Sequence, residues 1–99
     1  MSWALADVEA RASKYASFEI PGRAKREALR VGDLAKLVFV DLQIHDGASG
    51  ERMWVEIVRV VAGRYRGRLR NAPVVIDGLE EGALVDFGPE HVADWEVGK

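Results

Sequence analysis

The sequence predicts an α+β fold, in which an N-terminal helix and a short second helix pack on a curved antiparallel sheet of about five strands. Apolar residues recur at helical spacing only within residues 1–30. Residues 31–99 consist instead of short β-branched runs, separated by turns that contain glycine or proline. Because helices come first and strands follow through tight turns, we expect an antiparallel meander that curves towards a half-barrel.

The longer helix is expected over residues 2–16, with Ser2 as its N-cap. A thin apolar stripe runs along it at spacings of three and four residues: Leu5, Val8, Ala12 and Tyr15. The Pro21-Gly22 step then ends the helical pattern, because proline disfavours helix in the residue before it and glycine permits a turn. A second helix is expected over residues 23–29. Three of its small or aliphatic residues are expected to face inward: Ala24, Ala28 and Leu29.

The second part of the chain holds five extended runs that are rich in valine, leucine or other strand-forming residues. They cover residues 34–44, 53–61, 64–70, 74–76 and 83–87. The run at 53–61 is the strongest strand, because β-branched residues fill most of it. Pro89 opens a last turn, in which His91 is expected to cap or orient the chain.

The whole chain, residues 1–99, is expected to form one domain, because 99 residues suffice for one hydrophobic core. The absence of cysteine excludes a disulfide, a thiolate metal site and a cysteine nucleophile. His45 and His91 are too few and too far apart in the sequence to indicate a zinc site, so we expect no metal and no cofactor. Early acidic residues and the lack of a long apolar run predict a cytoplasmic protein that does not enter a membrane.

Charge is unevenly distributed along the chain. Residues 1–70 hold 13 basic and 9 acidic side chains, whereas residues 71–99 hold 1 basic and 7 acidic side chains. The basic body and the acidic tail can therefore pair within the molecule, or they can present patches of opposite sign.

Four arginines alternate with other residues in the run at 64–70: Arg64, Arg66, Arg68 and Arg70. Because side chains of a strand alternate between its faces, all four are expected on one face of the sheet. Such a row can bind phosphates or a partner's carboxylates. The alternative is a solvated sheet face whose arginines are paired by the acidic tail.

Two other features allow two interpretations each. Arg23, Arg26 and Arg30 lie on one face of the second predicted helix, either as an extension of the basic field or as a wet outer surface. Trp3, near the N-terminus, either packs onto the body of the protein or remains exposed as an anchor for a partner.

Four segments of the chain carry a resemblance to a known family. They are residues 32–39 (GDLAKLVF), 51–57 (ERMWVEI), 67–73 (GRLRNAP) and 87–95 (FGPEHVADW). Together they resemble the YegJ-like family of bacterial domains of unknown function, over roughly residues 18–95. The resemblance implies a compact bacterial domain and supplies no catalytic residues. Its most recognisable residues are expected to be structural: Met53, Trp54, Asp94 and Trp95. One departure is Gly82-Ala83, where the family usually has Gly-Asp.

The leading functional hypothesis is a non-enzymatic interaction or regulatory domain that binds an unknown protein partner through the sheet or its edge. The second hypothesis is anion or nucleic-acid binding by the arginine row, with affinity that falls steeply with salt. The third is a small hydrolase that uses acidic residues near the C-terminus: Asp86, Glu90 and Asp94.

Overall fold

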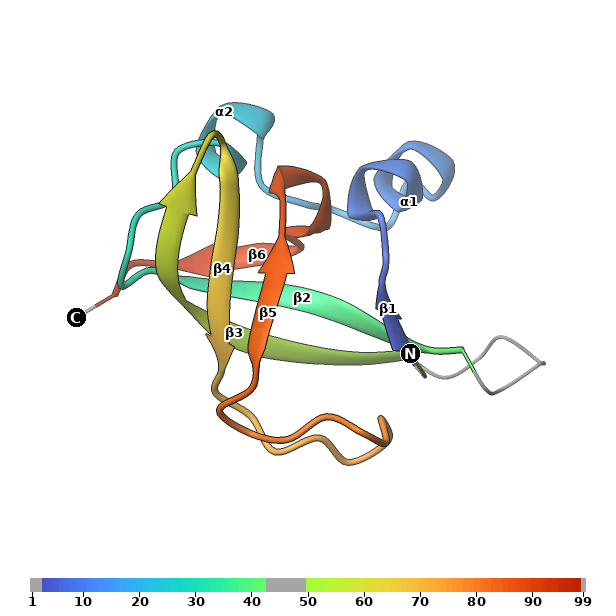
Figure 1. Cartoon of the computed structure of the whole chain (residues 1–99). Coiled ribbons are helices and arrows are strands. Elements are labelled where there is room, and N and C mark those ends of the chain that lie inside the picture. Colours follow the sequence, from blue (N-terminus) through green and yellow to red (C-terminus); the bar gives the residue numbers. More distant parts are fainter. Residues whose placement is uncertain (1–2, 43–49, 99) are drawn as a thin grey trace.

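The structure is a computed structural model of the chain and describes residues 3–42 and 50–98. Its strands are β1 (Trp3–Leu5), β2 (Leu34–Asp41), β3 (Gly50–Val61), β4 (Arg64–Leu69), β5 (Leu84–Phe87) and β6 (Asp94–Glu96). Its helices are α1 (Val8–Lys14), α2 (Arg23–Arg26) and the 3₁₀ helix η1 (Pro89–His91). Figure 1 shows the strongly curved sheet with both α-helices near one end. The predicted α+β class, with helices packed against an antiparallel half-barrel, is confirmed.

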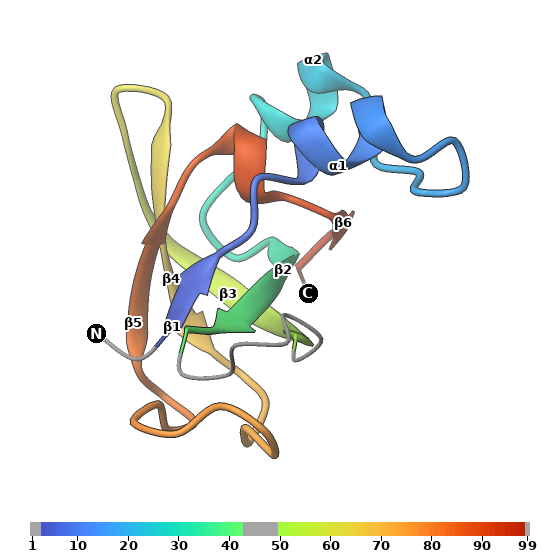
Figure 2. The same cartoon turned by 90° about the vertical axis from the view of Figure 1, so that its right-hand side faces the viewer.

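The described strands form one antiparallel sheet in the order β1-β2-β3-β4-β5, and β6 also pairs with β2. Strand β6 pairs with the beginning of β2, at Leu34–Lys36, and β1 pairs with its end, at Phe39–Asp41. The first and last strands therefore share one edge of β2, as Figure 2 also shows. This arrangement makes the N-terminal segment part of the sheet.

The prediction of a helix over residues 2–16 is therefore wrong at its beginning, and α1 also ends earlier than predicted, at Lys14. Trp3–Leu5 forms β1, and the helix begins only at Val8, because the Asp7 carboxylate accepts a hydrogen bond from the Ala10 N–H at 3.0 Å. Asp7, not Ser2, is the N-cap residue of α1. Pairing with β2 satisfies the backbone groups of residues 3–5 and overrides their weak helical preference.

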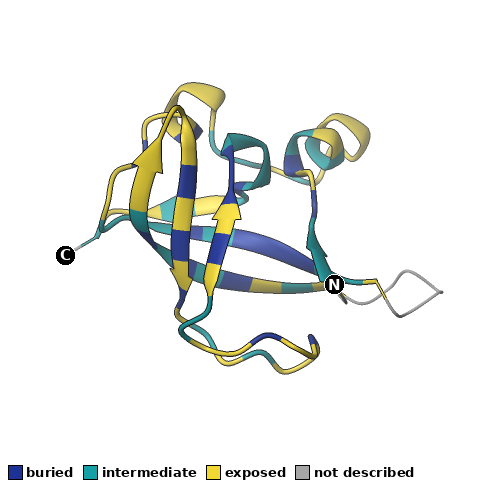
Figure 3. Ribbon diagram, viewed as in Figure 1, coloured by how far each residue is buried: buried dark blue, intermediate teal, exposed yellow. Residues whose placement is uncertain are grey.

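The main core lies on the concave side of the sheet and takes alternate residues of β2 and β3. Figure 3 shows buried positions alternating with less buried ones along the strands. The largest fully buried side chains in it are Leu37, Phe39, Met53, Ile57, Leu69 and Phe87. A smaller cluster lies on the other face of β2, where Val38 packs with Ala6 and Val8. Phe18 and Ile20, in the chain between the helices, cover part of this outer cluster.

The second helix is oriented differently from the sequence prediction. Ala24 and Ala28 are exposed, whereas Arg26 is only 5% exposed; Leu29 is buried as expected. The Arg26 guanidinium binds Glu9 at 2.7 Å and the carbonyl oxygens of Pro21 and Pro89 at 2.8 and 2.9 Å. Arg23, Arg26 and Arg30 therefore do not share the one exposed face that the sequence predicts, because Arg26 is turned inward. Its contacts with three separate segments compensate the buried charge.

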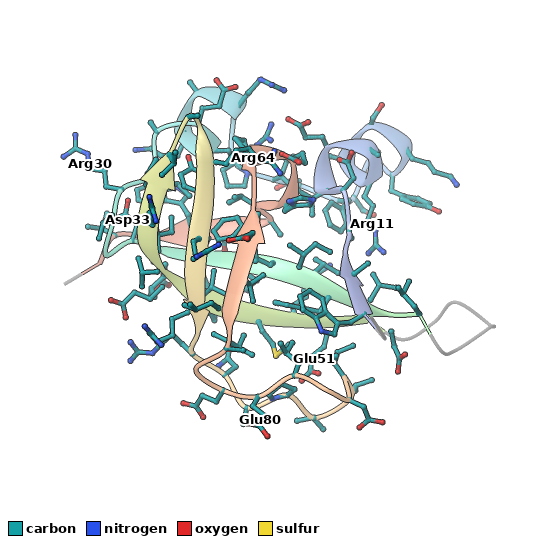
Figure 4. All side chains as sticks on the ribbon, viewed as in Figure 1. Arg11, Arg30, Asp33, Glu51, Arg64 and Glu80 are labelled. Atoms are coloured by element: carbon teal, nitrogen blue, oxygen red, sulfur yellow. The ribbon has the colours of Figure 1, made fainter. Side chains whose placement is uncertain are left out.

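The region around residues 74–76 is not the strand that its valines predict. The backbone N–H groups of Val74, Val75 and Ile76 instead donate hydrogen bonds to the Glu51 carboxylate at 2.8, 3.0 and 3.3 Å. Figure 4 shows Glu51 beside the loop that joins β4 to β5. A side chain of β3 thus replaces the strand partner that these N–H groups would otherwise need.

Glu51 makes a testable contribution to the pH dependence of stability. Partial burial acts to raise the pKa of Glu51, but the three N–H groups outweigh burial and hold the pKa below its ordinary value of 4.5. The stabilisation by these hydrogen bonds is therefore complete above that value and is lost as pH falls through the folded-state pKa.

We expect Glu51→Gln to lower the unfolding free energy by about 1–2 kcal/mol at pH 7. Urea unfolding should show this difference shrinking between about pH 5 and pH 3; a constant difference would contradict the assignment. Glu80→Gln, which changes an exposed carboxylate of the β4–β5 loop, is the control.

Candidate binding surface on the outer face of the sheet

The arginine row lies where the alternation of β4 places it. Arg64, Arg66 and Arg68 are exposed on the convex face, while Tyr65, Gly67 and Leu69 are buried between them. Arg70 directly follows β4 and is exposed as well. Within β4, the three arginines therefore lie on one solvent-facing side, as the alternation predicts.

Most of this row is neutralised within the molecule. Three of its arginines form ion pairs: Arg64 with Glu90 at 2.9 Å, Arg66 with Asp86 at 2.7 Å, and Arg70 with Glu56. Arg68 donates instead to the carbonyl oxygen of Gly82 at 3.3 Å. Two of the three carboxylates come from the acidic tail, as the interpretation of internal pairing expects.

The acidic residues of the hydrolase hypothesis do not converge. The hydrogen bond from Arg66 lowers the pKa of Asp86. Burial acts to raise the pKa of Glu90, but hydrogen bonds, including that from Arg64, lower it overall. Asp94 lies on β6, at the opposite end of the sheet from β5, and lines a different hollow. A general acid needs a raised pKa, so the arrangement of this trio does not support acid catalysis.

Aromatic rings and cations meet on the outer face of β2 and β3. Trp54 is half-buried and points outward, because the buried positions of β3 are its neighbours Met53 and Val55. Lys36 lies opposite Trp54 in the register, with its Nζ 4.9 Å from the centre of the Trp54 ring. The Arg52 guanidinium lies 5.4 Å from the centre of the Phe18 ring. We call Phe18, Lys36, Arg52 and Trp54 the Trp54 patch.

Neither cation of the Trp54 patch has an ion-pair partner among residues 3–42 and 50–98. A groove of about 460 Å³ adjoins Phe18, Lys36 and Arg52. A second groove of about 480 Å³ is lined by Trp54, Leu34 and Arg70, among others. The Trp54 ring therefore stands between two open grooves, and the two cations on one side of it form no ion pair within the described residues.

The other residues that the family resemblance marks are held by the fold. Met53 is buried in the main core, and the Trp95 ring packs against that core while the Lys25 Nζ lies 4.3 Å from its centre. The Asp94 carboxylate accepts a hydrogen bond from the Trp95 N–H at 2.8 Å. Trp3 also packs against the main core, with its ring centre 5.4 Å from that of Phe39. For Trp3, the interpretation as a packed residue is therefore confirmed.

The sequence prediction missed Arg59. Met53, Val55 and Ile57 point inward, so strict alternation would also point Arg59 into the core. The β3–β4 register instead shifts between Ile57 and Arg59, and this β-bulge places Arg59 outside, opposite Arg66. The sequence did hold a signal for this bulge, because Arg59 occupies a position that strict alternation would place among the inward-facing apolar residues.

His91 has the orienting role that the sequence predicts, since its Nδ1 accepts a hydrogen bond from the Gly88 N–H at 3.0 Å. Burial lowers the pKa of His91, which favours this neutral, accepting form. His45 lies outside the described residues. In the described part of the chain, no cluster of three or more histidine, aspartate or glutamate residues is arranged to hold a metal ion.

Comparisons with protein-family models, with curated proteins and with solved structures found no match for this chain. None of the helices in the described ranges is long and apolar enough to cross a membrane.

Proposed function

We propose that the protein is a non-enzymatic interaction module, and that the Trp54 patch docks an acidic segment of a partner protein. The observation that carries this proposal is a half-buried tryptophan beside two cations, Lys36 and Arg52, neither of which forms an ion pair within residues 3–42 and 50–98. Tryptophan and arginine dominate the binding energy of many protein interfaces. The Arg52 cation favours a negatively charged occupant, and Asp94, opposite Lys36 in the β2–β6 register, reduces the contribution of Lys36.

The local geometry supports this docking mode. The Lys36 ammonium is already positioned over the Trp54 ring, and the Arg52 guanidinium lies near the Phe18 ring, so part of the cost of ordering these long side chains is met before binding. The two grooves beside Trp54 provide space for an extended chain that crosses the ring. Glu19 and Asp94 line the first groove, and their carboxylates select against ligands that carry negative charge along their whole length.

Anion or nucleic-acid binding by the arginine row is a second proposal. Its support is the exposed face of β4, where Arg68 has only a carbonyl partner. The ion pairs of Arg64, Arg66 and Arg70 reduce its expected strength, because a polyanion must compete with carboxylates already bound. Membership of the YegJ-like family and a cytoplasmic location stay predictions.

The test of the docking proposal uses an array of soluble peptides in which acidic and aliphatic residues are combined, followed by NMR titration of the best binder. We expect amide shifts at Lys36, Arg52 and Trp54, and we expect Trp54→Ala to weaken binding by about 30-fold, as for an interface hot spot. Arg52→Glu should weaken it by at least about 10-fold, because it reverses a charge in contact with the ligand. Arg30→Glu is the matched control, since Arg30 is exposed and points away from the molecule (Figure 4).

Capture from nuclease-treated lysate extends the test to natural partners. A discrete protein that wild type and Arg30→Glu retain, and that Arg52→Glu loses, would support the docking proposal. Retention of that protein by Arg52→Glu and Trp54→Ala would overturn it. Material that disappears on nuclease treatment would favour the arginine row, and salt titration would then measure the number of phosphate contacts.

A further inference from the structure

The β-bulge in β3 creates an unusual pair of like charges. It places Arg59 directly opposite Arg66 on the outer face, and like charges at opposed positions destabilise antiparallel strands. Asp86 binds Arg66 at 2.7 and 3.2 Å, but Arg59 has no ion-pair partner within residues 3–42 and 50–98. One positive charge is therefore left over, and a bound anion would relieve it.

The surroundings of this pair form a hollow of about 390 Å³. Its lining combines Arg59, Arg64 and Arg66 with the Asp86 carboxylate and with apolar surface from the exposed Val61 side chain. Glu90 neutralises Arg64, and Asp86 neutralises Arg66. The hollow thus offers a net positive charge at its polar part and the exposed apolar side chain of Val61 beside it.

We infer that this hollow binds a phosphate monoester carried on a small apolar or aromatic body. The phosphoryl oxygens accept hydrogen bonds from Arg59 and from the outer guanidinium nitrogens of Arg66, because planar guanidinium forks match such oxygens. The apolar body packs against Val61, whose residue is 52% exposed. Asp86 opposes binding, since its carboxylate competes for Arg66 and repels the ligand. This site does not depend on the Trp54 patch.

Phenyl phosphate is the probe that tests this inference, in an NMR titration that follows the arginine Nε–H signals and the amides of β3 and β4. We expect Arg59→Gln to weaken binding by about 10-fold, which is the loss of one charged hydrogen-bonding group. Asp86→Asn should strengthen binding several-fold, because it removes the competing carboxylate. Arg11→Gln and Glu80→Gln are the controls for net charge, since α1 and the β4–β5 loop lie away from the β3–β4 turn (Figures 1, 2 and 4).

Titrations with other ligands identify the class of ligand that the hollow binds. Inorganic phosphate should bind more weakly than phenyl phosphate, and benzoate should bind more weakly than either dianion. A phosphotyrosine peptide that binds more tightly than phenyl phosphate would identify a modified protein as the source, and equal binding would identify a small molecule. Equal losses of phenyl phosphate affinity in Arg59→Gln and Arg11→Gln would overturn the inference. An unchanged affinity in Asp86→Asn would overturn it as well. Trp54→Ala should leave this titration unchanged, so the inference and the docking proposal fail independently.

Discussion

Replacement of Arg26 by methionine is expected to lower the free energy of unfolding by about 2–4 kcal/mol. Methionine fills a similar volume but donates no hydrogen bond. The carbonyl oxygens of Pro21 and Pro89 would each lose a donor, and Glu9 would lose a partner at 2.7 Å. For a chain of this size the change corresponds to a fall in Tm of about 10–25 °C. Urea unfolding followed by circular dichroism measures it directly.

Arg23 provides a matched control for this experiment, because it binds the same Glu9 carboxylate at 2.9 Å. Its side chain is 65% exposed, whereas that of Arg26 is 6% exposed. We expect Arg23→Met to change stability by less than about 1 kcal/mol, as is usual for exposed ion pairs. Similar losses in the two variants would show that burial of Arg26 is not what makes it important.

Arg26→Lys separates charge from geometry. Lysine keeps the positive charge near Glu9, but its single ammonium cannot reproduce the fork that reaches Pro21 and Pro89 together. An intermediate loss is therefore expected. A lysine variant as stable as the wild type would assign the whole effect to the Glu9 pair.

Replacement of Gly67 by alanine is expected to cost about 1–3 kcal/mol, although it adds only one methyl group. Gly67 points into the core between Arg66 and Arg68. A Cβ atom there would lie 2.8 Å from Cγ2 of Val55 and 3.1 Å from Cε1 of Phe87. Both neighbours are fully buried in a packed core, so neither can move without displacing others. Thermal unfolding should show the loss.

Two further variants test the steric origin of this loss. Gly22→Ala is the control for glycine replacement itself, since a Cβ at Gly22 meets nothing within 4 Å, and we expect its effect to stay within about 0.5 kcal/mol. Val55→Ala removes Cγ2, the atom that the new methyl group meets first, but keeps the Val55 Cβ, which it would meet at 2.9 Å. Gly67→Ala should therefore cost only slightly less in the Val55→Ala background than alone. Complete relief of the loss in the double variant would contradict a clash with both Val55 and Phe87.

The parts of the fold that depend on local pattern were predictable. The alternation of arginine with Tyr65, Gly67 and Leu69 placed the arginine row outside and its neighbours inside, as the structure has them. The β-branched run at 53–61 is the central part of β3 (Gly50–Val61). Such patterns are readable because a side chain's direction in a strand depends only on its position along that strand.

The parts that depend on distant partners were not predictable in the same way. Arg26 is buried because Glu9 and Pro89 come to it from other segments of the chain, and no spacing within residues 23–29 indicates this. The N–H groups of residues 74–76 bind a carboxylate of β3, although their valines favour a strand. In both cases a partner far away in the sequence decided between conformations that local preference leaves close in energy.

The sequence by itself thus determined the class of the fold, the strands with clear alternation and the exposed face of the arginine row, because each follows from the period of neighbouring side chains. Only the tertiary structure decided which cations form ion pairs. Ion pairs are formed by Arg64, Arg66 and Arg70. No ion-pair partner within the described residues is found for Lys36, Arg52 or Arg59. The physical reason is that neutralisation depends on distances of a few ångströms between strands, and the register and the bulge of β3 set those distances.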